Sequence, residues 1–356
     1  MLNIPFVDRA GAWFLESGIQ EQSGGVARYY VADAQQNRPI STEITGYAVS
    51  ALVYLYSLTQ DHRYLTAATG AARFLTRSAW DSGLRIFPFE CSGPSLAYFF
   101  DSGIIVRGLL SLWRVTGDRE LIDIAEQCGR SMAQDFAAGN AGYDPILRLP
   151  EKDPLPRGEK WSRQQGCYQL KAALAWHDLH KETGQADFLK LYDGALTASL
   201  RTHDSFLPGA EGDLVMDRLH AYCYFLEASL PRADRPEVAS ALAGGIAKVS
   251  HYLREIAPQF DRSDVYAQLL RVRVLTECAG GVSVDRSAAA HEAEKIESFQ
   301  VDDPDRRIRG GSFFARRGGQ LQPHVNPVST AFGLQALAMW RQYLAGERQF
   351  APGALI

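Results

Sequence analysis

A helical segment that recurs three times in the first half of the chain limits its fold more than any other feature. The three copies share a glycine, an aromatic residue and a threonine at matched places: Gly46, Tyr56 and Thr59; Gly103, Trp113 and Thr116; Gly166, Trp176 and Thr183. The first copy reads TGYAVSALVYLYSL, which is apolar nearly all round and therefore typical of a helix buried on most sides. Repeated helical units bury their faces by stacking, so the sequence predicts an array of helical hairpins.

Fainter copies extend this pattern to the end of the chain. We expect helices at 217–230, 235–256, 263–278, 288–299 and 327–344. The last of them has no partner after it, and a helix expected at 7–17 has none before it. We therefore predict an all-α fold, an (α/α)6 toroid of about six helical hairpins, in one domain over residues 1–356. Pairing of helix 7–17 with helix 327–344 would close the ring.

Long connections are expected between the hairpins, and short ones within them. Several long connections contain a glycine-rich extended piece, at 24–29, 83–87, 142–143 and 310–314. We predict short β-hairpins there, on one face of the ring. Because each long loop leads into the start of a buried helix, the loops and these helix starts should gather at the same end. Long ordered loops in a compact domain usually carry function.

Charge and composition exclude several classes of protein. The net charge of −4 gives no basic field for nucleic acid or an anionic membrane. The sequence has neither a long uncharged apolar run nor a signal-peptide pattern near its start, so we expect a cytoplasmic protein. The five cysteines are scattered without a CxxC pair, which indicates reduced thiols and no zinc site. Glycine-rich stretches lack the spacing of a phosphate loop, and we expect no cofactor.

Polar and aromatic side chains cluster at the predicted helix starts. The candidate catalytic residues are Glu43, Asp101, Asp217, His220, Asp264 and His324. The candidate substrate-binding residues are Tyr47, Tyr98, Trp161, Arg163, Gln164, Arg218, Tyr266 and Asn326. Carboxylates that transfer protons and rings that stack on pyranose faces together suit a sugar site.

A purely structural interpretation competes with this one. Small polar residues at helix starts are caps by default, which applies to Thr42, Asp101, Asp217, Ser263 and Asn326. Tyr47, Tyr98 and Trp161 could be core aromatics, and each histidine could be a hydrogen-bonded structural residue. The convergence of so many such groups at one end of the ring favours a site.

Two groups of basic residues suggest an acidic ligand. One group comprises Arg306, Arg307, Arg309, Arg316 and Arg317, and the other comprises Arg157, Lys160 and Arg163. Arginine forks suit carboxylate, sulfate or phosphate. The alternative is a solvated loop face, since Asp302, Asp303 and Asp305 neutralise part of the first group.

The hairpin periodicity, the expected closure and the Gly-Gly-aromatic loops resemble the six-hairpin glycosidase superfamily of (α/α)6 toroids. The resemblance covers about residues 5–345. That superfamily includes unsaturated glucuronyl hydrolases, and related toroids include N-acylglucosamine 2-epimerases, some polysaccharide lyases and terpene cyclases. In the glycosidases the working carboxylates lie at the funnel mouth, so the resemblance makes Glu43, Asp101, Asp217 and Asp264 the analogous candidates.

Our first hypothesis is a carbohydrate-active enzyme, a glycoside hydrolase that acts on an acidic, uronate-type sugar. Asp101 and Glu43 would be the acid–base pair, with Asp217 or Asp264 as the alternative partner. Two arginines, Arg163 and Arg218, would hold the anionic group, and Tyr47 and Trp161 would stack on the sugar.

Three alternatives remain open at this point. A sugar epimerase or isomerase would use His220 and His324, because histidine titrates near neutral pH. A polysaccharide lyase would use the same residues for elimination. A non-catalytic toroid would only bind a glycan or a protein partner. The polar helix starts argue against a terpene cyclase, and the sequence leaves the oligomeric state open.

Overall fold

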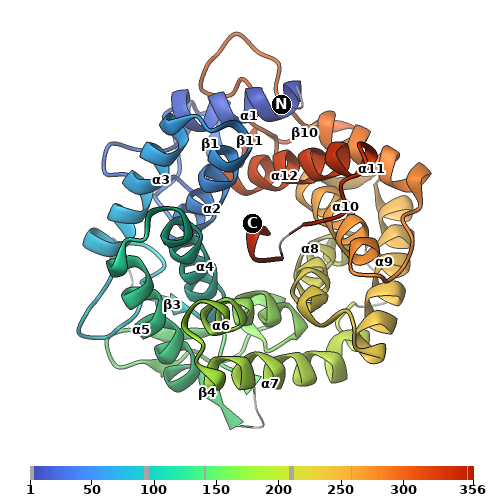
Figure 1. Ribbon diagram of the computed structural model, residues 1–356. Coiled ribbons are helices and arrows are strands. Elements are labelled where there is room, and N and C mark those ends of the chain that lie inside the picture. The colour runs from blue at the N-terminus through green and yellow to red at the C-terminus, as the bar shows by residue number, and fades with distance from the viewer. Residues whose placement is uncertain (1–3, 92–95, 140–141, 208–211, 258, 351) are drawn as a thin grey trace. The chain divides into compact units, whose positions relative to one another are not determined.

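The computed structural model describes residues 4–91, 96–139, 142–207, 212–257, 259–350 and 352–356. The chain is mainly helical (Figure 1). It forms two compact units. Unit 1 comprises Met1–Ile19, Tyr29–Arg38 and Asp204–Ile356, and unit 2 comprises Gln20–Arg28 and Pro39–His203. Among the described residues, no helix is both long enough and apolar enough to cross a membrane.

Unit 2 is built from three successive helical hairpins. Its helices are α2 (Thr42–Thr59), α3 (His62–Phe74), α4 (Phe99–Thr116), α5 (Arg119–Asp135), α6 (Leu170–Thr183) and α7 (Ala186–Thr202). Helices α2, α4 and α6 pack side by side, and each is covered by the helix that follows it. Burial follows the sequence pattern, since residues 101–110 of α4 are all buried, whereas α5 buries one apolar face.

Short strands in unit 2 lie next to the helix starts. Strands β3 (Leu96–Tyr98), β6 (Ile146–Arg148) and β7 (Asp153–Pro154) form one antiparallel sheet, and β4 (Ala137–Ala138) pairs with β5 (Gly142–Tyr143). Because β3 runs directly into α4, the pairing of Tyr98 with Ile146 fixes the start of that helix.

The repeated threonine makes the same turn in all three hairpins. Its hydroxyl donates to the carbonyl four residues earlier and accepts the backbone N–H two residues later. The residue after it is left-handed: Gln60, Gly117 and Gly184 have φ of 59°, 69° and 73°. Such a residue ends a helix. Asp61 and Asp118 then cap α3 and α5. The repeat seen in the sequence is therefore a repeated helix–turn–helix geometry.

Two glycines of the repeat allow close helix contact. A methyl group on Gly103 of α4 would lie 2.4 Å from Cα of Ala172 in α6, and one on Gly46 of α2 would lie 2.9 Å from Cα of Ile105 in α4. No real side chain fits at these distances. Gly166, the third glycine of the alignment, precedes α6 and lies outside any helix, so the repeat is looser there.

We predict that Gly103→Ala destabilises the protein by about 1–3 kcal/mol, because the added methyl overpacks the contact between α4 and α6. Gly194→Ala in α7 is the matched control, since nothing lies within 4 Å of its added methyl. That change should stabilise the helix by about 0.5–1 kcal/mol. Urea unfolding of both variants checks this, and equal effects would contradict the steric argument.

Unit 1 contains the remaining helices. They are α1 (Pro5–Glu16), α8 (Gly212–Ser229), α9 (Pro236–Ile256), α10 (Ser263–Cys278), α11 (Arg286–Glu297) and α12 (Pro327–Leu344). Helix α10 packs between α8 and α12 and is buried along almost its whole length. Helices α9, α11 and α1 pack on α8, α10 and α12 respectively.

Two small antiparallel sheets in unit 1 lead into α10 and α12. One has the strand order β11 (His324–Val325), β1 (Tyr30–Val31), β2 (Gln36–Asn37). The other has the order β10 (Gln320–Leu321), β9 (Ala315–Arg317), β8 (Phe260–Arg262). Strand β8 continues into α10, and β11 continues into α12 through Asn326.

The structure confirms the predicted helices and corrects several local details. Helix α8 begins at Gly212, so Asp217 lies in its second turn and does not cap it. Ser41 caps α2, whereas the Thr42 hydroxyl donates to the carbonyl of Pro88. No side chain caps α4 or α10, so neither Asp101 nor Ser263 has that role.

The predicted β-hairpins are only partly regular. Residues 142–143 form a strand, whereas the pieces at 24–29, 83–87 and 310–314 pair mainly through isolated bridges. Helix α1 packs on α12 within unit 1. The single domain over residues 1–356 stays a prediction.

Candidate functional site

Two carboxyl groups, one half-buried and one buried, lie in the first turns of neighbouring helices of unit 2. Glu43 belongs to α2 and Asp101 to α4. Asp101 is 5% exposed, and its Oδ2 atom has no hydrogen-bond partner among the described residues. Burial raises the pKa of Glu43 to about 7 and the pKa of Asp101 well above its usual range. The negative charge of Glu43 raises the pKa of Asp101 further, while Arg28 opposes both shifts.

This pair can therefore hold a proton near neutral pH. Two carboxyl groups that repel each other in a buried site cannot both ionise easily. One member can then act as a general acid while the other is ionised, which is the requirement of acid–base chemistry on a glycosidic bond.

Aromatic and basic groups surround the carboxyl pair. Arg28 forms an ion pair with Glu90, and its guanidinium lies 4.6 Å from the ring centre of Phe89. The Phe89 ring in turn lies 4.9 Å from that of Tyr98. Burial raises the pKa of the Tyr98 hydroxyl, and the charge of Asp101 adds to this effect. Tyr98 is thus close to the carboxyl pair, as expected.

The segment before α6 supplies the other predicted ligands of unit 2. Trp161 and Arg163 belong to one short helical turn (residues 161–163), and the Trp161 ring meets the edge of Tyr168 at 5.0 Å. The Tyr168 hydroxyl donates to the carbonyl of Gln164 at 2.9 Å. Arg163 is exposed, and its charge acts on Tyr98. Tyr47 is only 1% exposed, which is the burial of a core residue.

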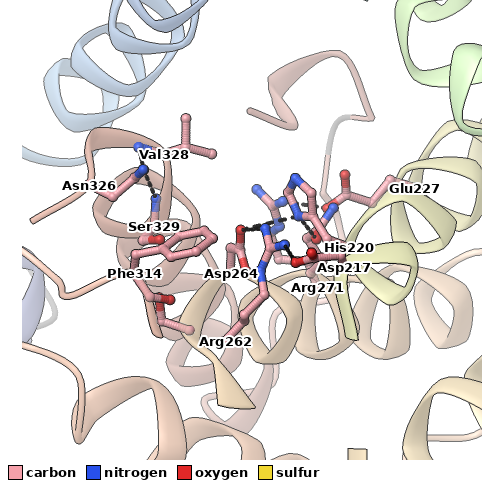
Figure 2. Close-up of polar contacts among 12 residues, drawn as sticks. Asp217, His220, Glu227, Arg262, Asp264, Arg271, Phe314, Asn326, Val328 and Ser329 are labelled. Atoms are coloured by element: carbon pink, nitrogen blue, oxygen red, sulfur yellow. Dashed lines mark hydrogen bonds and ion pairs between the residues drawn. The ribbon is translucent and has the colours of Figure 1, made fainter. Parts of the chain in front are cut away.

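A second polar cluster lies in unit 1 and centres on His220 of α8 (Figure 2). Its Nδ1 atom lies 2.8 Å from Oε1 of Gln268 and 3.2 Å from Oδ2 of Asp264. Both partners belong to α10, one turn apart. Since a carboxylate oxygen only accepts hydrogen bonds, Nδ1 carries the proton and the Nε2 lone pair is left for chemistry.

The environment keeps the His220 ring neutral. Burial lowers its pKa to about 4, and this effect outweighs the opposing charge of Asp264. The ring also packs on Tyr224 at 4.4 Å in a T-shaped contact, which fixes its orientation. A neutral, oriented imidazole with a protonated Nδ1 is the form that a general base requires.

Arg262 fixes the carboxylates of this cluster (Figure 2). Its Nε and Nη2 atoms donate to the two oxygens of Asp264 at 3.1 and 2.7 Å, and Nη1 donates to Asp217 at 2.8 Å. The guanidinium also lies 4.4 Å from the ring centre of Phe314. The pKa of Asp264 is lowered although burial opposes this, because Arg262 stabilises its charge. Asp264 is thereby ionised behind His220.

Among the described residues, the other predicted site residues of unit 1 form no hydrogen bond or ring contact with His220. The ring of His324 lies 4.9 Å from Tyr29, and Asn326 caps α12. Arg218 donates to the carbonyl of Phe206 at 2.9 Å. Tyr266 is buried, and burial and the charge of Asp261 raise its pKa.

Three arginines of the last long loop have structural partners. Arg307 lies over Tyr30 and donates to Asn37, Arg316 pairs with Asp261 and lies over Phe299, and Arg317 lies over Phe260. Their stacking on rings accounts for this part of the basic group without a ligand.

Sequence reasoning missed Arg28 and Gln268. A helical spacing could have found Gln268, because it lies four residues after Asp264 on the same face of α10. Arg28 gave no such signal, since it approaches the carboxyl pair from an irregular segment. Among the described residues, no group of three His, Cys, Asp or Glu side chains is placed to hold a metal ion.

Comparisons with known proteins address the fold. No family model and no curated protein sequence matches the chain. Solved structures do match over nearly the whole length. A sugar epimerase from a ruminal bacterium is 13% identical, with a TM-score of 0.73 over 94% of this chain and 96% of that one. The cellobiose 2-epimerase of Spirochaeta thermophila is 15% identical, with a TM-score of 0.70 over 94% and 95%.

A D-mannose isomerase is 10% identical, with a TM-score of 0.71 over 95% of this chain and 97% of that one. The chain shares the fold of these structures, an all-α (α/α)6 toroid. The predicted fold class is thus confirmed.

Proposed function

We propose that the protein is a carbohydrate-active enzyme that isomerises or epimerises a sugar by proton transfer at the carbon next to the carbonyl group. His220 is the general base in this proposal. The observation that carries it is the neutral imidazole of His220, held through Nδ1 by Asp264 and Gln268. Three solved structures of similar fold, two sugar epimerases and a D-mannose isomerase, agree with this chemistry.

The reaction transfers one proton away and one proton back. His220 Nε2 removes the proton from the carbon next to the carbonyl, and the electron pair forms an enediolate. Return of this proton by His220 to the neighbouring carbon gives the isomer. Uptake of a proton from water on the opposite face of the first carbon gives the epimer, and His220 then releases its proton to solvent. Asp264 stabilises the imidazolium that forms in between, and Arg262 holds Asp264 in place.

Deuterium uptake tests the proposal directly. The protein is incubated in heavy water with mannose, cellobiose and glucuronate in turn, and each sugar is followed by NMR. Deuterium at the carbon next to the carbonyl, without new reducing ends, supports the proposal. Release of reducing ends without deuterium at that carbon contradicts it, and so does a lack of any turnover on a wider panel of aldoses and ketoses.

Hydrolysis of an acidic, uronate-type sugar is the second candidate. It is favoured by the Glu43–Asp101 pair, which can hold one proton near neutral pH. In this case we expect Glu43→Gln and Asp101→Asn each to lower the release of reducing ends by about 100-fold or more, because general acid–base catalysis contributes about 10²–10⁴-fold.

The matched control for these variants is Glu126→Gln, a half-buried carboxylate of α5 paired with Arg130. It should leave the rate unchanged. Full activity of both carboxyl variants would contradict the proposal that this pair catalyses hydrolysis. Loss of activity in the control as well would indicate that the variants are unstable.

A further inference from the structure

Unit 2 contains a cavity that neither of these proposals uses. Its volume is about 730 Å³, within the usual range of small-molecule sites, about 300–1,000 Å³. It lies between the segment 164–170 that begins α6 and the end of α7, beside Gly142 and Tyr143. We propose that this cavity binds the acidic group and hydroxyls of an anionic saccharide, through Arg157 and Arg201.

The charge in the cavity favours an anion. Arg157 and Arg201 both line it, and neither forms an ion pair or hydrogen bond with any described residue. None of the described lining residues is acidic. Two unpaired guanidinium groups beside one cavity match a carboxylate or sulfate, which arginine binds through paired N–H donors.

Uncharged polar groups in the cavity favour a sugar over a bare anion. The Nε2 atom of Gln165 is buried and has no hydrogen-bond partner among the described residues. Its amide lies against Gly142, where an added methyl group would come within 2.7 Å of it. Ser199 of α7 lines the same space. A buried amide donor without a partner is costly, and a ligand hydroxyl would satisfy it.

Contacts with neighbouring residues hold the walls of the cavity in place. Tyr143 stacks on Phe99 at 4.7 Å with an angle of 9° between the rings. Gln164 lines the cavity, and its backbone carbonyl accepts a hydrogen bond from the Tyr168 hydroxyl. Burial raises the pKa of this hydroxyl, and the charge of Asp101 raises it further. Tyr168 thus bonds to the cavity wall and also feels the charge of Asp101.

The test measures binding by calorimetry, with glucuronate as the probe, glucose as its neutral counterpart and sulfate as the anion alone. We expect saturable binding of glucuronate and at least tenfold weaker binding of glucose and of sulfate. The double variant Arg157→Gln/Arg201→Gln should weaken glucuronate binding at least tenfold. Arg119→Gln is the control, because that arginine is exposed on α5 and pairs with Asp123, away from the cavity lining.

The saccharide class rests on the proposed function, but the two fail in different ways. Unchanged glucuronate binding in the double variant overturns the cavity as the site, and sulfate binding as tight as that of glucuronate overturns the saccharide. Absence of saturable glucuronate binding overturns the proposal as a whole. If the cavity is the site, the His220→Gln variant should bind glucuronate as the wild type does, whether or not it turns sugar over. Failure of the catalytic proposal alone therefore leaves the binding result unchanged.

Discussion

His220→Gln is expected to lower the rate of deuterium exchange into the sugar by about 10²–10⁴-fold, the usual contribution of a positioned general base. Glutamine is close in size to histidine and keeps a hydrogen-bonding group near Gln268 and Asp264. It offers no lone pair that is basic enough to remove a proton from carbon. The measurement is the initial rate of deuterium uptake by NMR, at saturating sugar.

The control for this variant is His251→Gln on α9. His251 is exposed, pairs with Glu255 one turn away and lies 5.7 Å from the ring of its neighbour Tyr252. Its replacement should leave both the exchange rate and the unfolding midpoint unchanged. Exchange at the wild-type rate in His220→Gln, with the fold intact, would show that another group is the base.

The pH dependence separates the two catalytic proposals. Since burial lowers the pKa of His220 to about 4, the ring is the neutral base at all higher pH, and kcat/KM for exchange should fall only below about pH 4. An unperturbed histidine would lose activity below about pH 6.5. For hydrolysis, the charge of ionised Glu43 raises the pKa of Asp101, so Asp101 keeps the proton as the acid and Glu43 must be ionised. Because the pKa of Glu43 is about 7, kcat/KM for hydrolysis should already fall below about pH 7.

The fold could be predicted because its information is local and repeated. Each Thr turn, with a left-handed residue after it, lies within a few positions in the sequence, and three copies reinforce one another. The carboxyl pair was predictable for a similar reason, since Glu43 and Asp101 lie at helix starts. Their altered pKa values were not, because these depend on how deeply α2 and α4 are buried together.

Contacts between segments distant in the sequence could not be predicted from it. Arg262 joins Asp217 and Asp264, and His220 meets Gln268, across many intervening residues that carry no pattern linking them. The burial of Tyr47 was equally hidden. Helix α2 is apolar nearly all round, so its sequence does not show which face is turned toward the core.

Arg271→Met is expected to destabilise the protein by about 3–5 kcal/mol, the usual cost of breaking a buried ion pair by removing one partner. Arg271 of α10 and Glu227 of α8 are both 0% exposed and form an ion pair. The guanidinium also donates to Gln335 of α12 at 3.0 Å and lies 4.0 Å from the ring centre of Phe332. Arg271 therefore links the three helices that form the centre of unit 1, and its loss should lower the unfolding midpoint in urea.

The double variant Arg271→Met/Glu227→Leu identifies the cause of that loss. If the cost arises from a carboxylate left in the core without its cation, removing the carboxylate as well should restore most of the stability, because apolar replacements of buried pairs are often neutral or stabilising. If the double variant is as unstable as the single one, the cost arises instead from lost packing against Phe332 and the lost bond to Gln335. Arg119→Met, at an exposed pair, should change the free energy of unfolding by less than about 1 kcal/mol, which sets the scale for both results.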